Sequence, residues 1–127
     1  MILDSSALLA ILLAETGSER LIRAVADAPL VAIGAPTLVE TAIVLTSRLA
    51  RDARPLLNDF LREAAIEIIP FTPDHYDIAV DTFQRYGKGR HPAALNFGDC
   101  LTYAIARVSG FPLLFTSEDF SRTDLLG

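Results

Sequence analysis

Short apolar runs alternate along this chain with longer segments in which apolar residues recur three and four positions apart. The short runs are rich in aliphatic and β-branched residues and predict four strands, at Met1–Asp4, Leu30–Gly34, Ala65–Phe71 and Pro112–Thr116. The intervening segments have the period of amphipathic helices. Strands that alternate with helices predict a parallel sheet with right-handed crossovers, covered by helices on both faces.

Capping residues, prolines and glycines mark where the helices begin and end. Pro36 is suited to the first turn of a helix, and Asn96 and Gly110 are good N-cap and C-terminal residues. The predicted helices are Ala7–Ala14, Glu19–Ala28, Thr37–Ala50, a segment from Pro55 to Ala64, a segment that opens at Thr72, and Phe97–Ser109. No repeat or linker interrupts this pattern, so residues 1–127 are expected to form one α/β domain.

Three acidic residues stand alone in otherwise uncharged sequence. Asp4 lies within MILDSSALLAILLA, Glu40 within PTLVETAIVL and Asp99 within LNFGDCLTYAIA. None has a lysine or arginine in its own segment, and carboxylates are rarely buried without a partner. The pattern predicts carboxylates that are largely desolvated.

The predicted fold brings these acids to one edge of the sheet. Asp4 ends the first strand, Glu40 and Asp99 lie early in helices, and Ser117-Glu118-Asp119 follows the last strand. Ligands of open α/β sheets bind at the carboxyl ends of the strands. Two carboxylates about 4 Å apart repel by about 4 kcal/mol at a surface-like dielectric constant. A hard divalent cation removes that repulsion, and oxygen ligands favour Mg²⁺ or Mn²⁺.

Each acid also has an ordinary structural explanation. Asp4 could cap the first helix, Asp99 and Asp119 could interact with helix dipoles, and Glu40 could pair with a distant arginine. The convergence of all four on one edge favours a metal site over four separate explanations.

Four sequence blocks together resemble a known family. MILDSSALLAIL, PTLVETAIVL, YGKGRHPAALNFGDCLTYAIA and LLFTSEDFSRTDL resemble, in order and spacing, the PIN-domain ribonuclease toxins of the VapBC toxin–antitoxin type. The resemblance covers nearly the whole chain and implies a single PIN domain, a three-layer sandwich with a mostly parallel sheet of four to five strands. By this resemblance Asp4, Glu40 and Asp99 match the three core acids, and Asp119 matches a fourth, more variable one.

The chain departs from the family pattern after its last strand. Family members often carry Lys-Gly before the final acidic pair, whereas this chain has Thr116 and Ser117 there. The departure leaves open whether Glu118 or Asp119 reaches the metal.

The resemblance implies a metal-dependent endoribonuclease. Its acids would hold one or two Mg²⁺ or Mn²⁺ ions, which activate a water molecule and stabilise charge on the scissile phosphate, so no covalent nucleophile is required. The hydroxyl groups of Ser5, Ser6 and Thr116 could hydrogen-bond the acids or a metal-bound water. Helix capping and bonding at strand ends are equal alternatives for these three residues.

Charge and composition refine this picture. The formal net charge is −5, which argues against general nucleic-acid binding, yet Thr82–Gly98 carries Arg85, Lys88 and Arg90 with no acid. This local charge of +3 is a candidate RNA-binding segment, with a solvated basic turn as the alternative. One cysteine and no secretory or membrane segment are typical of a cytoplasmic protein.

For the other candidate residues, a structural role is the more ordinary interpretation. Tyr86 and Phe97 flank the basic segment and could stack on a base, but both are expected in the core. Cys100 is expected to be a small core residue rather than a nucleophile. His75 is expected in the first turn of a helix, and two distant histidines with one cysteine argue against a zinc site.

The resemblance implies a protein partner as well. A VapB-like antitoxin would cover the toxin and insert a basic side chain into the Asp4–Glu40–Asp99 pocket. The helices over Ala7–Leu13 and Leu38–Leu49 are apolar nearly all round, which predicts a covered surface. A homodimer could cover the same faces.

Two other function classes fit less well. An acid-pocket phosphatase needs a second aspartate where this chain has Ser6, and a receiver domain needs a lysine where it has Thr116. A non-catalytic PIN-like binding module would have no need of an intact set of acids.

Overall fold

Parallel strands in the order β3–β2–β1–β4 form the centre of the fold. The computed structural model describes residues 1–116 and 119–124. Within that part of the chain the sheet has four strands, β1 (Ile2–Leu3), β2 (Ala32–Gly34), β3 (Glu67–Ile69) and β4 (Leu113–Leu114). The helices are α1 (Ser5–Leu12), α2 (Ser18–Asp27), α3 (Ala35–Leu49), α4 (Arg54–Glu63), α5 (Pro73–Tyr86) and α6 (Phe97–Ser109), and a short 3₁₀ helix, η1, covers Asp119–Arg122.

Alternate residues of the central strands enter two separate cores. Ile2 and Leu113 pack with α5 and α6, whereas their neighbours Leu3 and Leu114 pack with α1, α2 and α4. Successive side chains of a strand point to opposite faces, so both faces of β1 and β4 are buried. This burial on both faces explains why these strands read as unbroken apolar runs.

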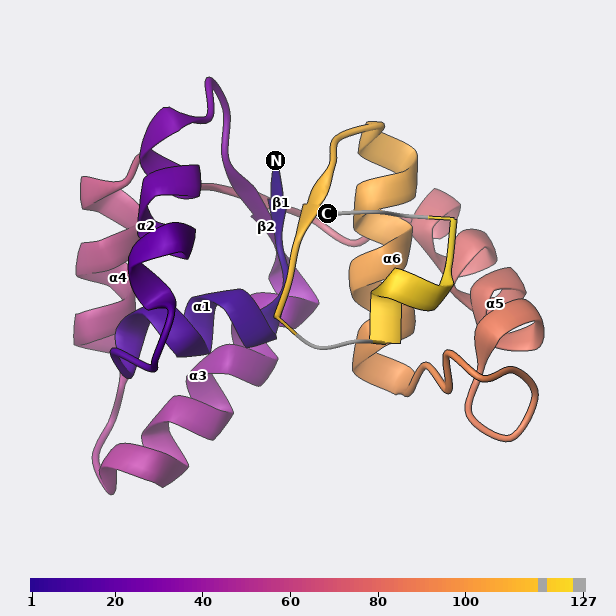
Figure 1. The fold of residues 1–127 in the computed structure, drawn as a ribbon, viewed down its shortest axis with the longest axis horizontal. Coiled ribbons are helices and arrows are strands. Elements are labelled where there is room, and N and C mark those ends of the chain that lie inside the picture. Colours follow the sequence, from indigo (N-terminus) through magenta and orange to yellow (C-terminus); the bar gives the residue numbers. More distant parts are fainter. Residues whose placement is uncertain (117–118, 125–127) are drawn as a thin grey trace.

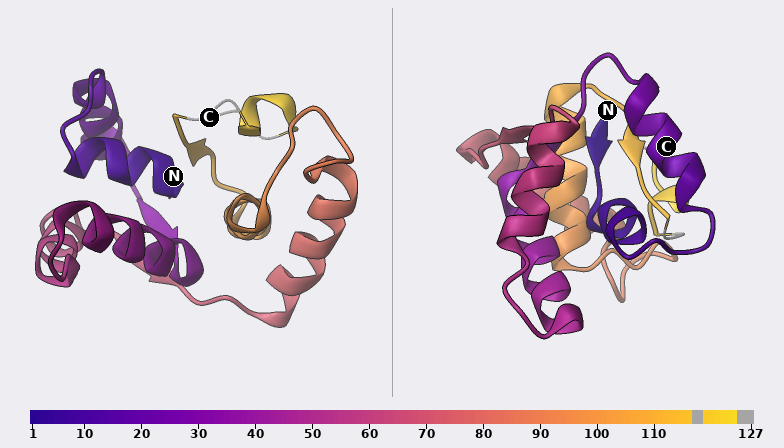
Figure 2. Two further views of the ribbon diagram at one scale, coloured as in Figure 1. Left: turned by 90° about the horizontal axis from the view of Figure 1, so that it is seen from below. Right: turned by 90° about the vertical axis from the view of Figure 1, so that its left-hand side faces the viewer.

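The helices form a layer on each side of the sheet. Figure 2 shows α1 to α4 on one side of the strands and α5 with α6 on the other. In Figure 1 the chain enters α1, α3 and α6 at the same edge of the sheet, where the strands have their carboxyl ends. The three-layer α/β fold expected from the sequence is therefore confirmed, with every strand pairing parallel.

The predicted elements are confirmed, but the strands are shorter than their apolar runs. The third run, Ala65–Phe71, yields a strand of only three residues, β3, at one edge of the sheet. Glu67 and Ile68 in this strand are exposed, since an edge strand has a neighbour on one side only. Apolar composition predicts where a strand lies better than how far its pairing extends.

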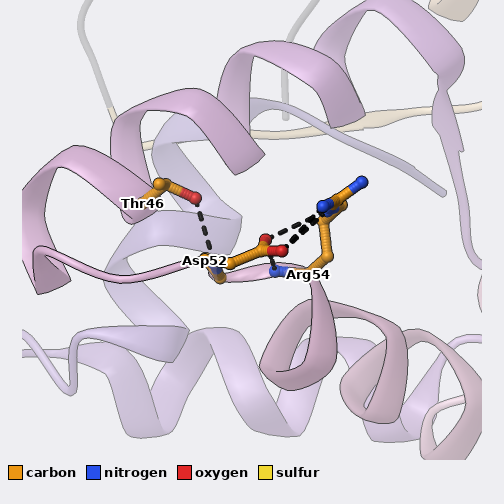
Figure 3. Close-up of polar contacts among 4 residues, drawn as sticks. Thr46, Asp52 and Arg54 are labelled. Carbon is orange, nitrogen blue, oxygen red and sulfur yellow. Dashed lines mark hydrogen bonds and ion pairs between the residues drawn. The ribbon is translucent and has the colours of Figure 1, made fainter.

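The turn between α3 and α4 is closed by local polar contacts. Thr46 Oγ1 accepts a hydrogen bond from the Ala53 amide at 3.0 Å, and the Arg54 guanidinium donates to both oxygens of Asp52 (Figure 3). The adjacent guanidinium holds the pKa of the Asp52 carboxyl at about 2. Both charged groups are exposed, so this ion pair fixes the turn locally and adds little to the stability of the whole fold.

Within the described part of the chain, every helix is too short or too polar to cross a lipid bilayer.

Candidate active site

Asp4 lies at the junction of β1 and α1, where it caps the helix. Its backbone amide donates to the Leu114 carbonyl at 3.0 Å, which ties the end of β1 to β4. Its Oδ2 accepts from both the amide and the hydroxyl of Ser6, at 3.1 and 2.5 Å. Ser6 Oγ also accepts from the Thr116 amide at 3.0 Å. Asp4 therefore caps α1, which is the ordinary structural explanation considered for it from the sequence. Capping alone does not account for its burial.

The Asp4 side chain is only 3% exposed. Burial raises its pKa above the ordinary value, and hydrogen bonds from Ser6, the Ser5 backbone and the Thr102 hydroxyl partly oppose that rise. Surface caps keep their carboxylates in water, so a buried capping carboxylate is costly. A carboxylate whose burial costs free energy, at the edge of a sheet where the strands have their carboxyl ends, is typical of a functional site.

Asp99 lies in the first turn of α6, in a reciprocal capping box with Asn96. Asp99 Oδ2 accepts from the Asn96 amide at 3.0 Å, and Asn96 Oδ1 accepts from the Asp99 amide at 2.9 Å. The box holds the Asp99 carboxylate at the start of the helix, where the helix dipole favours negative charge.

Glu40 lies one turn into α3 and reaches toward the start of α6. A Cβ atom built on Gly98 would lie 2.6 Å from Glu40 Oε2, so the carboxylate occupies the space that any other residue would fill. Gly98 has no left-handed backbone angle, which means that this close approach is the reason for a glycine here. Glu40 and Asp99 are thereby brought to neighbouring positions around the first turn of α6.

The structure thus places the three elements that carry these acids side by side, with Glu40 against the first turn of α6 that carries Asp99. Asp4 is buried, whereas Glu40 and Asp99 are half-buried, so the expected desolvation is full for Asp4 and partial for the other two. No three His, Cys, Asp or Glu side chains of the described residues already surround a common metal position. Asp4 is turned toward Ser6 and Asp99 toward Asn96, so the carboxylates would have to move to share one ion.

The fourth acid follows β4 in the short helix η1. Asp119 is the first residue of η1, but its side chain lies outside the described residues, as do Ser117 and Glu118. The segment that carries it is anchored by Phe120, which is fully buried. It is also anchored by Asp124, which accepts a hydrogen bond from the Tyr103 hydroxyl.

The basic segment gives its three cations different surroundings. Arg85 lies 3.8 Å from Asp124 and over the Tyr86 ring at 4.8 Å, so it helps to hold the segment that follows η1. Arg90 lies over the Phe83 ring at 5.5 Å, and Lys88 is exposed. Lys88 and Arg90 therefore remain the better candidates for contacts with phosphate.

Three of the other expectations are confirmed, and one is wrong. His75 is buried in the capping box of α5 with Thr72, and Tyr86 is in the core. Burial, aided by the negative charge of Asp99, raises the pKa of the Cys100 thiol to about 11, so it is no nucleophile at neutral pH. Phe97 was expected in the core but is 79% exposed at the first residue of α6.

An apolar groove of about 990 Å³ opens beside the acids, between α3, α5 and the first turn of α6. Glu40 and Gly98 lie along it. Six exposed apolar side chains also line it: Val39, Ile43, Tyr76, Val80, Phe83 and Phe97. The fold itself covers part of the apolar surface of α1, since Ala7, Leu8, Ala10 and Ile11 are buried, whereas Leu9, Leu12 and Leu13 are half-buried. Of the two helices expected to meet a partner, α3 alone carries exposed large apolar residues on the described surface.

Sequence reasoning missed three contributors to this site. Gly98 precedes Asp99 directly, and glycine inside a helical pattern signals a close approach. Thr37 and Thr102 stand three residues from Glu40 and from Asp99, on the same helix faces. A threonine one turn from an isolated acid is the only local signal for Thr37 and Thr102, and it does not show that the two hydroxyl groups meet.

Residues 1–126 match the PIN domain family. Over 125 residues the chain is 45% identical to a Mycolicibacterium smegmatis protein named Ribonuclease VapC, covering 98% of this chain and 97% of that one. It is 39% identical to Ribonuclease VapC30 of Mycobacterium tuberculosis, covering 98% of this chain and 95% of the relative.

Solved structures show the same fold at low sequence identity. VapC20 of Mycobacterium tuberculosis, described as a sarcin–ricin loop cleaving toxin, superposes with a TM-score of 0.80 at 20% identity, covering 98% and 95% of the two chains. A chain of a toxin–antitoxin complex from Klebsiella pneumoniae gives a TM-score of 0.73 at 18% identity, covering 97% and 92%.

Proposed function

The chain belongs to the PIN-domain family of VapC ribonucleases, the toxins of toxin–antitoxin pairs, and we propose that it hydrolyses RNA with a divalent metal ion held by Asp4, Glu40 and Asp99. The observation that carries this proposal is the meeting of three acid-bearing elements around the first turn of α6. Glu40 fills the space above Gly98, and the Thr102 hydroxyl of the same helix stabilises the charged form of Asp4.

The donor set fits a hard cation. The three core groups offer carboxylate oxygen only, and the nearby Cys100 thiol stays protonated at neutral pH. Oxygen ligands suit Mg²⁺ and Mn²⁺ rather than zinc. A bound ion of this kind would supply an activated water and neutralise charge on the scissile phosphate.

The residues of the chain have separate tasks in this scheme. Asp4 is oriented from one side by Ser6 and from the other by Thr102. Asp99 is held at the positive end of α6 by its capping box, and Gly98 admits the carboxylate of Glu40. Asp119, at the start of η1, is proposed as the fourth acid, with Glu118 as the alternative.

Metal-dependent cleavage distinguishes this function from a binding module that keeps the PIN fold without catalysis. The purified protein should cut total RNA in Mn²⁺ or Mg²⁺ and stop when a chelator is added. The metal should also raise the melting temperature, because a ligand that binds only the folded state stabilises it. A protein that is stabilised by metal but leaves RNA intact would favour the binding module.

Lys88 and Arg90 are proposed to bind the RNA backbone. The variant Lys88→Ala/Arg90→Ala should bind RNA more weakly, with a log–log salt dependence flatter by roughly one unit for each lost phosphate contact. Replacing Arg20 and Arg23 of α2, which are also exposed, is the matched control and should leave the slope unchanged. Equal slopes for parent and Lys88→Ala/Arg90→Ala would assign the segment to a solvated turn.

An antitoxin is the proposed protein partner. Because the proposed metal site consists of carboxylates, a basic side chain of the antitoxin would neutralise them and compete with the metal. Co-expression with the neighbouring open reading frame, followed by mass measurement of the purified complex, tests this idea. A chain that is harmless to its host and recruits no small co-encoded protein would contradict it.

A second copy of the chain is the proposed occupant of the apolar groove. A two-fold interface presents the same face twice, so the exposed apolar residues of α3 and α5 would meet their own counterparts. The parent should therefore have twice the 13.8 kDa mass of the chain in solution. Ile43→Asp, in the groove, should yield monomers, whereas Val108→Asp, at an exposed apolar position of α6 outside it, should not. A monomeric parent, or a dimer that survives Ile43→Asp, would contradict this assignment.

A further inference from the structure

Two threonines place their hydroxyl groups in the protein interior beside Asp4. The side chains of Thr37 and Thr102 are 2% and 0% exposed. Their Oγ1 atoms lie 2.8 Å apart, and the Thr102 hydroxyl lies beside the Asp4 carboxylate, whose charged form it stabilises. Burying a hydroxyl group costs free energy unless the group is hydrogen-bonded. The mutual hydrogen bond of this pair is therefore a specific arrangement and not an accidental result of helix packing.

The direction of these hydrogen bonds follows from the donors available. Each threonine hydroxyl carries one proton, and an ionised carboxylate only accepts. With Asp4 ionised, the Thr102 hydroxyl is placed to donate toward Asp4 and to accept from Thr37. Thr41, which is also fully buried, donates to the backbone carbonyl of Thr37 at 2.8 Å and takes no part in the chain of hydroxyls.

The hydroxyl chain joins the three elements that carry the acids. Thr37 precedes Glu40 by three residues on α3, and Thr102 follows Asp99 by three residues on α6, so each threonine lies on the same helix face as its acid. Asp4 completes the chain from the β1–α1 junction. The hydrogen bond between Thr37 and Thr102 thus links α3 and α6 one turn away from their acids, Glu40 and Asp99.

We infer that Thr37 and Thr102 are positioning residues that hold the Asp4 carboxylate in place for metal binding. The inference rests on the proposed metal-dependent function. Ser6 fixes Oδ2 from the side of α1, and the threonine pair ties the same carboxylate to α3 and α6. Groups that orient metal-binding carboxylates in this way affect metal affinity without touching the substrate.

Isosteric replacement of Thr102 tests this role. Thr102→Val keeps the shape and removes the hydroxyl, so Mn²⁺ affinity measured by calorimetry should fall roughly 10- to 100-fold. The kcat for RNA cleavage should fall with it, while KM for RNA stays unchanged. Thr102→Ser retains the hydroxyl and should restore both metal affinity and kcat.

Thr41→Val is the matched control, because it removes an equally buried hydroxyl from α3 that does not reach Asp4. It should lower the melting temperature about as much as Thr102→Val but leave Mn²⁺ affinity and kcat within about twofold of the parent. Thr37→Val should weaken Mn²⁺ binding, and adding it to Thr102→Val should cause little further loss, since Thr37 acts through Thr102.

Unchanged Mn²⁺ affinity in folded Thr102→Val overturns the inference, and so does an equal loss in Thr41→Val. If Thr102→Val does not fold, the Mn²⁺ affinity of Thr37→Val is compared with that of Thr41→Val instead. A parent that binds Mn²⁺ but cleaves no RNA contradicts the proposed function alone, because the titration still decides whether the threonines position Asp4. A parent that binds no Mn²⁺ overturns both.

Discussion

Replacing Asp4 by asparagine should abolish metal-dependent cleavage and raise the melting temperature of the metal-free protein. Asparagine has nearly the same shape and can still accept from Ser6, so the fold is kept. It removes a charge that is 3% exposed and that the metal requires. Losing about 4 kcal/mol of transition-state stabilisation corresponds to a cleavage rate about 1000-fold lower.

The gain in stability should depend on pH in a definite direction. Burial raises the pKa of Asp4 in the folded protein above its ordinary value. Below the ordinary pKa, Asp4 is protonated in both the folded and the unfolded chain, and its full contribution to stability is present. This contribution is lost as the pH rises through the raised pKa of the folded state, because the buried carboxyl must then ionise. Asparagine does not ionise. The difference in melting temperature between Asp4→Asn and the parent should therefore be largest near neutral pH and shrink in acid.

Thermal melts from acidic to neutral pH measure this difference, with Asp81→Asn as the control at an exposed acid of α5. That control should cleave RNA like the parent and melt like it at each pH. An Asp4→Asn protein that still cleaves RNA, or that is less stable than the parent at neutral pH, would show that Asp4 is a structural cap.

Gly98→Ala should reduce RNA cleavage by about 100-fold. The new Cβ would lie 2.6 Å from Glu40 Oε2, so the glutamate must leave its place beside Asp99. A displacement of about 1 Å at a reacting centre can cost about 100-fold in rate. The helix itself does not require glycine, since alanine is favoured inside helices by roughly 1 kcal/mol.

A double-mutant comparison isolates the contact. In the parent, the better helix propensity of alanine and the clash with Glu40 should roughly offset each other, leaving the melting temperature nearly unchanged. In the Glu40→Ala background the clash is absent, and Gly98→Ala should then raise the melting temperature. If it raises the melting temperature equally in both backgrounds and cleavage persists, Glu40 does not occupy the space above Gly98.

The order of elements and the acid-bearing edge were predictable because each has a local signal in the sequence. Burial on both faces makes β1 and β4 unbroken apolar runs, and Asn96 and Gly110 mark the ends of α6. Parallel pairing then carries the ends of the strands to one edge of the sheet, so the elements that carry Asp4, Glu40 and Asp99 could be placed at that edge from the sequence alone.

What could not be predicted depends on how side chains pack across elements. Phe97 reads as a core residue, yet its position at the start of α6 leaves it exposed. The close approach of Glu40 to Gly98 and the bond between Thr37 and Thr102 join residues 58 and 65 positions apart. The distance between α3 and α6 sets these contacts, and no local pattern in the sequence encodes that distance.

The most direct test compares RNA cleavage by the parent and by Asp99→Asn in Mn²⁺, with the new RNA ends mapped. Asparagine can still accept from the Asn96 amide, so the capping box and the fold should survive while one metal-binding charge is lost. The parent should produce defined cleavage ends that disappear with a chelator, and Asp99→Asn should produce none above background. Cleavage at the same sites and the same rate by folded Asp99→Asn would contradict a catalytic centre built on these acids.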